Sequence, residues 1–150
     1  MSEIDFEFDA EEIKEFINKE IPPWQRATLF QALGESEEGV LNELGTTLTG
    51  ERHQSGLVLH LGVSKDPNGS LWSAIKLEVF DLFCTQSARY KDERQTATKH
   101  FRDMVLIVAT AIASTFHLAL GVVVGAVSVA IMAVAKVGRN AWCAANKPKG

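Results

Sequence analysis

The sequence predicts a small N-terminal α+β domain, made of short helices and a β-hairpin, followed by a long basic helix and a C-terminal transmembrane helix or helical hairpin. Charge is uneven, because the first 50 residues hold 12 acids and 3 bases, residues 51–103 hold 7 and 8, and residues 104–150 hold no acid and 4 bases. Apolar side chains change to a two-residue period after Gln54, and residues 104–135 carry no formally charged side chain. A hydrophobic content of 46% excludes a disordered chain.

Three short amphipathic helices are predicted at the front of the chain. Asp9, followed three residues later by Glu12, has the form of a capping box and begins a helix over residues 10–19. The proline pair at 22 and 23 ends that helix and starts a second one, which runs to residue 33 before Gly34. A third helix is expected over residues 36–44, so the front of the chain forms an acidic helical unit.

A β-hairpin is predicted next, with strands over residues 57–64 and 71–80. Leucine and valine alternate with other residues in the first strand, and residues 66–69, Asp-Pro-Asn-Gly, form a strong turn signal. The second stretch also fits a helix capped by Ser70, since its large apolar residues recur at helical spacing. The alternation favours the hairpin over this helix.

A basic juxtamembrane helix is predicted over residues 85–103, running without a break into the apolar segment. Five bases lie on it and would contact anionic lipid headgroups: Arg89, Lys91, Arg94, Lys99 and Arg102. Trp142 is expected to anchor at the membrane interface, followed by a basic tail. Nucleic acid is not an expected partner, because the acidic front half would repel a phosphate backbone.

The membrane segment is predicted over residues 104–144. Its 32-residue uncharged core exceeds the roughly 20 residues that one crossing needs, yet it is short for two crossings. A hairpin that turns near residues 114–117 is slightly favoured over a single tilted or kinked crossing. The remaining alternative is an apolar helix buried inside a soluble homo-oligomer.

Small residues in this segment predict self-association. Ala113, Gly121 and Gly125 lie on one helical ridge, and close backbone approach at such a ridge lets membrane helices pack. His117 lies on the same ridge and is a candidate pore-lining or pH-sensitive residue. The alternative is a neutral imidazole that is hydrogen-bonded to a neighbouring helix or placed at the turn.

No catalytic, cofactor-binding or metal site is predicted, because the sequence has no phosphate loop, nucleotide fingerprint, CxxC pair or zinc-protease motif. The chain is therefore expected not to be an enzyme. Cys84 and Cys143 are expected to be reduced, and Cys84 is interpreted as a small core residue. The acidic first 12 residues do not fit a cleavable secretory signal, which favours a cytoplasmic front domain.

The predicted organisation has four parts: an acidic cytosolic domain over 1–84, the basic helix over 85–103, the transmembrane segment over 104–144 and a basic tail over 145–150. The function favoured by this plan is a non-enzymatic membrane protein that needs no cofactor. Its front domain would bind a protein partner or ligand, and its rear helices would anchor it in lipid and assemble it as a homo-oligomer. The alternatives are a membrane-permeabilising effector controlled by the front domain and a soluble homo-oligomeric scaffold.

Overall fold

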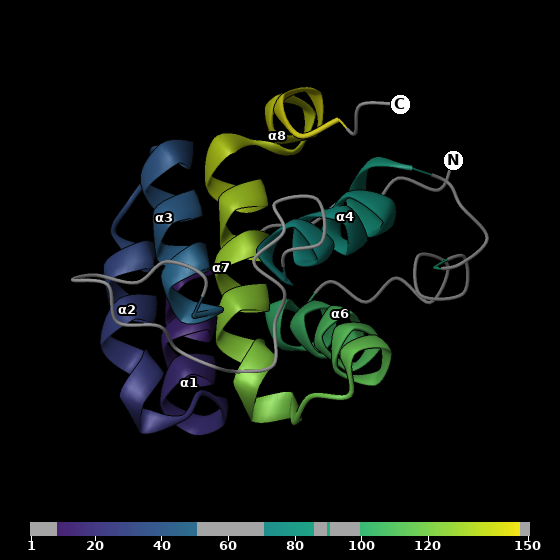
Figure 1. Cartoon of the computed structure of the whole chain (residues 1–150). Coiled ribbons are helices and arrows are strands. Elements are labelled where there is room, and N and C mark those ends of the chain that lie inside the picture. The colour runs from purple at the N-terminus through teal and green to yellow at the C-terminus, as the bar shows by residue number, and fades with distance from the viewer. Residues whose placement is uncertain (1–8, 51–70, 86–89, 91–99, 148–150) are drawn as a thin grey trace.

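The computed structural model describes residues 9–50, 71–85, 90 and 100–147. These residues form seven helices and no strand (Figure 1). The helices are α1 (Ala10–Glu20), α2 (Pro23–Leu33), α3 (Glu38–Leu48), α4 (Leu71–Cys84), α6 (Phe101–Phe116), α7 (Leu120–Val137) and α8 (Arg139–Ala145).

Helix α7 forms the centre of the structure. It runs through the middle of the bundle, and α2, α3, α4, α6 and α8 all pack against it (Figure 1). Every residue from Val123 to Val134 is buried. A helix that is apolar on all sides must be covered on all sides to leave water, which explains its central place.

The front helices begin and end largely where the sequence predicts. The Asp9 side chain accepts a hydrogen bond from the Glu11 backbone amide at 3.1 Å and caps α1. Helix α2 begins at Pro23, as predicted. Helix α3 is displaced from the expected 36–44, and Gly45, the first residue after the expected end, lies buried within it.

The predicted β-hairpin is wrong, and with it the α+β fold class. Residues 71–80 belong to helix α4, while the other expected strand, 57–64, lies outside the described residues. The strand interpretation places Ile75, Leu77 and Val79 on one buried face. In the structure Ile75 and Val79 are fully buried but Leu77 is 51% exposed, as a helical period requires.

The apolar run is divided between two helices that pack against each other. His100 has an extended backbone (φ −89°, ψ 136°), so α6 begins anew at Phe101, and the predicted unbroken helix from the basic segment is wrong at this point. Helix α6 ends at His117, which adopts the left-handed conformation (φ 57°), and α7 begins at Leu120. The turn therefore lies next to the position that the hairpin alternative predicts.

A disulfide joins Cys84, at the end of α4, to Cys143 in α8. The expectation that these two cysteines are reduced is thus corrected. Gly138, with φ 100°, lets the chain turn sharply after α7. The turn directs α8 back toward α4, so that the two cysteines lie close enough to bond. The sequence did not reveal this proximity, since the two residues are 59 positions apart.

Candidate functional site

Helix α7 differs from the other described helices in its length and apolar composition. It is the one described helix that is long and apolar enough to cross a membrane, with a mean hydropathy of 2.3 over 18 residues. Its two polar side chains are Ser128 and Lys136. The Ser128 hydroxyl donates to the Val124 carbonyl at 2.7 Å, and Lys136 lies exposed in the last turn. The buried length of α7 therefore carries no polar side chain that needs a partner outside the helix.

Helix α6 is less uniformly apolar than α7. Arg102 and Asp103 lie in its first turn, and the remainder carries no charge. One side is buried, through Phe101, Met104, Val105, Val108, Ala109 and Ile112. Three hydroxyl residues face solvent on the other side: Thr110, Ser114 and Thr115. Helix α6 is thus amphipathic where it covers α7.

The predicted small-residue ridge is split by the turn between α6 and α7. Ala113 is half-buried near the end of α6, and its carbonyl accepts the Leu118 amide at 3.0 Å. Gly121 is exposed in the first turn of α7, whereas Gly125 is buried against α2. In this conformation α2 occupies the glycine face on which self-association was predicted.

The residue that covers this glycine face is Gln25, which sequence reasoning missed. Gln25 is 4% exposed, and its side-chain nitrogen donates to the Gly121 carbonyl at 3.2 Å. Its Oε1 atom is buried and has no hydrogen-bond partner among the described residues. The sequence did contain a sign that Gln25 is buried, because Gln25 shares the helical spacing of Leu29 and Ala32, the other buried residues of α2.

The other predicted site residues are widely separated. His117 is exposed at the turn between α6 and α7, and Trp142 is buried in α8. Arg102 lies on the surface, and the remaining four predicted lipid-contacting bases, Arg89, Lys91, Arg94 and Lys99, lie outside the described residues. The structure does not bring His117, Arg102 and Trp142 together into one site.

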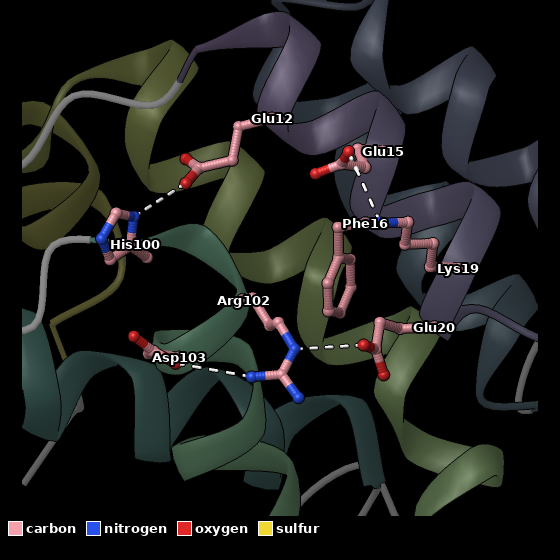
Figure 2. A pocket seen from close by; sticks show the side chains of 8 residues that line it. All are labelled: Glu12, Glu15, Phe16, Lys19, Glu20, His100, Arg102 and Asp103. Atoms are coloured by element: carbon pink, nitrogen blue, oxygen red, sulfur yellow. Dashed lines mark hydrogen bonds and ion pairs between the residues drawn. The ribbon is translucent and has the colours of Figure 1, made fainter.

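A pocket of about 380 Å³ lies between α1 and the first turn of α6 (Figure 2). Acidic and basic side chains line it around the Phe16 ring, which packs edge-on against Phe101 with centroids 5.3 Å apart. The lining residues are Glu12, Glu15, Phe16, Lys19, Glu20, His100, Arg102 and Asp103. The described residues contain no group of three or more potential metal ligands.

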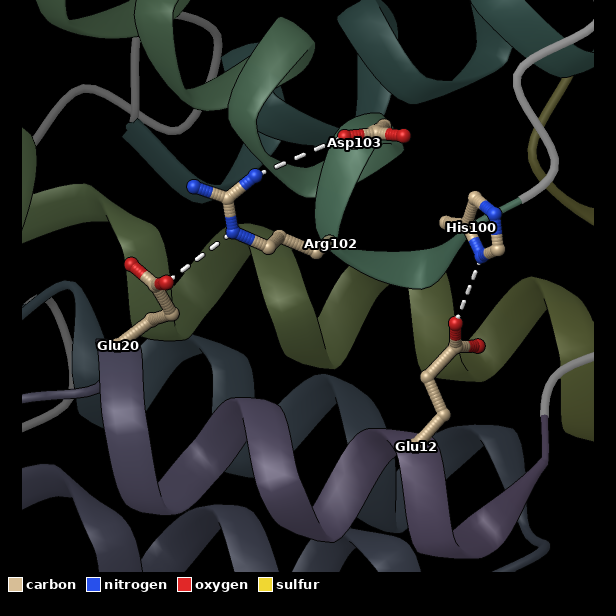
Figure 3. Close-up of polar contacts among 5 residues, drawn as sticks. All are labelled: Glu12, Glu20, His100, Arg102 and Asp103. Carbon is tan, nitrogen blue, oxygen red and sulfur yellow. Dashed lines mark hydrogen bonds and ion pairs between the residues drawn. The ribbon is translucent and has the colours of Figure 1, made fainter.

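Two ion pairs across this pocket join α1 to α6 (Figure 3). His100 Nδ1 lies 2.9 Å from Glu12 Oε2, and Arg102 Nε donates to Glu20 Oε2 at 3.1 Å. The hydrogen bond and the charge of Glu12 raise the pKa of His100. Lys19 pairs with Glu15 within α1 at 3.6 Å, whereas the His100 and Arg102 pairs connect α1 to the start of α6.

The comparisons with known proteins add no family. The chain matches no protein-family model, and neither a curated protein nor a solved structure shows significant similarity to it.

Proposed function

We propose that this protein is a non-enzymatic membrane protein that folds its membrane segment into its own helical bundle and inserts it when the bundle opens. The observation that carries this proposal is helix α7, with twelve consecutive buried residues surrounded by five other helices. Only the surrounding helices keep this apolar surface from water. Lipid is the other environment that would accept it.

Transfer of α7 from the bundle to a bilayer is chemically plausible. An 18-residue helix is about 27 Å long at 1.5 Å per residue, close to the roughly 30 Å of a hydrocarbon core. Its backbone groups are paired within the helix, and Ser128 is satisfied by Val124. Lys136, at one end, would reach the headgroups by extending its side chain.

The disulfide restricts how the oxidised chain could insert. Cys84 and Cys143 flank α6 and α7, and their Cα atoms are 5.7 Å apart. Two residues so close must lie on the same side of a bilayer about 30 Å thick. In the oxidised chain, α6 and α7 would therefore enter as a pair whose two ends remain on one face.

The position of His117 favours an anchor over a pore. It lies in the turn between α6 and α7 instead of within a helix. In an inserted pair it would lie at the tip, so it would not line the middle of a channel. A membrane-permeabilising effector remains the second hypothesis, and leakage of vesicle contents would distinguish it from an anchor.

The redox state of the compartment determines whether the Cys84–Cys143 disulfide persists. Disulfides persist in oxidising compartments and are reduced in the cytosol. If Cys84 and Cys143 both face the cytoplasm, their thiols would therefore be free, and the bond would form only on an oxidising side. Alkylation of free thiols during lysis reports which state the cell maintains.

The proposal is tested with full-length protein and phosphatidylcholine–phosphatidylglycerol vesicles. The bundle is opened by mild denaturant, as monitored by near-UV circular dichroism, and then diluted into the vesicles. We expect α6 and α7 to resist alkaline carbonate extraction and added protease, while α1–α3 are digested. Complete extraction by carbonate, after demonstrated opening, would contradict the proposal and assign α7 to an ordinary soluble core.

A locked variant provides the matched control. Gln25→Cys with Gly125→Cys, in a Cys84→Ser, Cys143→Ser background, would tie α2 to α7. The two positions face each other, because a Cβ atom at Gly125 would lie 3.0 Å from the Gln25 Cδ atom. Loss of free thiol on oxidation establishes that the bond has formed. The oxidised locked variant should remain extractable, and reduction should restore insertion.

A further inference from the structure

Apolar side chains are exposed at one end of the bundle, where two turns meet. Trp24, at the start of α2, is 77% exposed, and Leu120, at the start of α7, is 42% exposed. The Gln25 side chain joins the two segments through its bond to the Gly121 carbonyl. We define the tip as residues 21–25 together with residues 117–121, and both turns lie at the lower edge of Figure 1.

The tip carries no formal charge. Residues 21–25 and 117–121 contain no acid and no base apart from the imidazole of His117. The nearest charged side chains are already engaged, since Arg26 donates to the Ile21 carbonyl at 2.9 Å and Glu20 accepts from Arg102. A partner that recognises charge would find little to bind here.

The opposite end of the bundle is charged, with both signs present. Glu35 and Glu37 lie between α2 and α3 at this end, and Asn146 donates to Glu38 there. Lys136 and Lys147 are exposed there, and Arg139 donates to the Phe83 carbonyl at 3.1 Å. The long axis of the bundle thus runs from an uncharged apolar end to a charged end. This distribution suits a bilayer approached tip first, because the charged end would stay in water, where charged groups avoid the cost of burial.

We infer that the tip is a docking surface for the lipid bilayer interface, with Trp24 and Leu120 as its two anchors. Tryptophan prefers the headgroup region, where its ring is partly buried and its N–H stays hydrated. Leu120 would bury its side chain beside it. The inference rests on the proposed function and deepens it, because the tip is the end at which α6 and α7 would enter the membrane.

The fluorescence of Trp24 reports directly on contact between the tip and lipid. It is the exposed member of the three tryptophans, since Trp72 and Trp142 are 6% and 1% exposed. Vesicles of phosphatidylcholine brominated near the headgroup should quench Trp24 emission in the folded, oxidised protein. Trp24→Phe should remove this quenching, because the other two rings remain buried inside the bundle.

Matched serine variants measure the contribution of each anchor. Trp24→Ser and Leu120→Ser should each lower partitioning into phosphatidylcholine vesicles about tenfold, the factor that corresponds to 1.4 kcal/mol of lost apolar transfer. Leu77→Ser is the control, because Leu77 is 51% exposed but lies on α4, outside the tip. It should leave partitioning unchanged.

Several outcomes would overturn the inference. They are absence of binding to phosphatidylcholine vesicles, an equal loss in Leu77→Ser, and lipid-free dimerisation that the two tip variants abolish. Carbonate resistance that survives in both tip variants would sink the docking surface while the proposed function stands. Vesicle binding through the tip, without carbonate resistance after the bundle is opened, would contradict the proposed function while the docking surface stands.

Discussion

The side chain of Gln25 lies across the glycine face of α7, with its nitrogen 3.2 Å from the Gly121 carbonyl oxygen. Its oxygen occupies the space beside Gly125, where an added Cβ atom would lie only 2.0 Å away. A polar side chain in this place costs stability unless both of its ends are hydrogen-bonded. The contact between α2 and α7 is therefore close but weaker than an all-apolar contact, which agrees with the proposed opening of the bundle.

Gly125→Ala should destabilise the folded protein, whereas Gly121→Ala should not. The added methyl group at Gly125 meets buried Gln25, and overpacking costs about 1–3 kcal/mol, of which helix propensity returns up to about 1 kcal/mol. At Gly121 the nearest atom, Cγ of Pro22, would be 3.8 Å away, an ordinary contact. Urea unfolding of both variants measures the difference.

The partner in this clash is identified by a double-mutant cycle. Gln25→Ala removes the side chain that the new methyl group meets, so the Gly125→Ala cost should shrink in the Gln25→Ala background. An unchanged cost would place the conflict elsewhere, against Leu29, whose Cδ2 atom would be 3.5 Å away.

The sequence predicted the start of α1 and the start of α2 because these depend on neighbouring residues, whereas the bounds of α3 were displaced. Asp9 caps α1 and Pro23 starts α2, as local rules require. The β-hairpin failed because a short stretch fitted both periods. Contact with α7 decided in favour of the helix, and that contact was not visible in the stretch itself.

At the candidate site, too, contacts between residues far apart in the sequence were not predicted. The small-residue ridge predicted self-association through Gly121 and Gly125. In the structure Gln25 packs on Gly125 and donates to the carbonyl of Gly121, 96 positions away. The Cys84–Cys143 pair was likewise hidden by its separation of 59 positions. Helix period can mark a buried face, but it does not say which segment covers it.

Gly45→Ala should be strongly destabilising, and Gly39→Ala in the same helix is its control. A Cβ atom at Gly45 would lie 2.2 Å from the Trp72 ring, which is buried and held by its Nε1 bond to Asn42 Oδ1 at 3.2 Å. Because the ring is rigid, we expect a loss of about 2–3 kcal/mol. Gly39 has no such neighbour within 4 Å, so its substitution should be neutral or stabilising.

Thermal melting of the two variants checks this expectation. In a chain of 150 residues, about 1 kcal/mol shifts the midpoint by roughly 2–4 °C. Equal midpoints for Gly45→Ala and Gly39→Ala would show that Trp72 does not pack on α3 as described.

Cys84→Ser with Cys143→Ser should lower the free energy of unfolding by about 2–5 kcal/mol, because the bond restricts a long loop in the unfolded chain. The loop contains both α6 and α7, so its loss should also make the bundle open more readily. Denaturant unfolding, with and without reductant, provides the measurement. Wild-type protein under reductant should match the double variant, and a reductant effect that persists in the double variant would contradict this assignment.

His100→Gln should change how stability depends on pH. Glu12 raises the pKa of His100, so the folded protein binds a proton more tightly than the unfolded chain does. The stabilisation is fully present below the unfolded pKa of about 6.5 and is lost as the pH rises through the higher folded pKa. Wild type should therefore exceed His100→Gln in stability at about pH 6, with the difference shrinking by about pH 8.

Nuclear magnetic resonance titration of the imidazole tests the cause directly. Glu12→Gln should return the His100 pKa toward its ordinary value, because it removes the carboxylate that lies 2.9 Å from Nδ1. The part of the pH dependence that comes from the Glu12–His100 pair should disappear in the same variant, since glutamine has no charge to pair with the imidazolium. A His100 pKa that stays raised in Glu12→Gln would transfer the effect to Asp103, the other carboxylate that raises it.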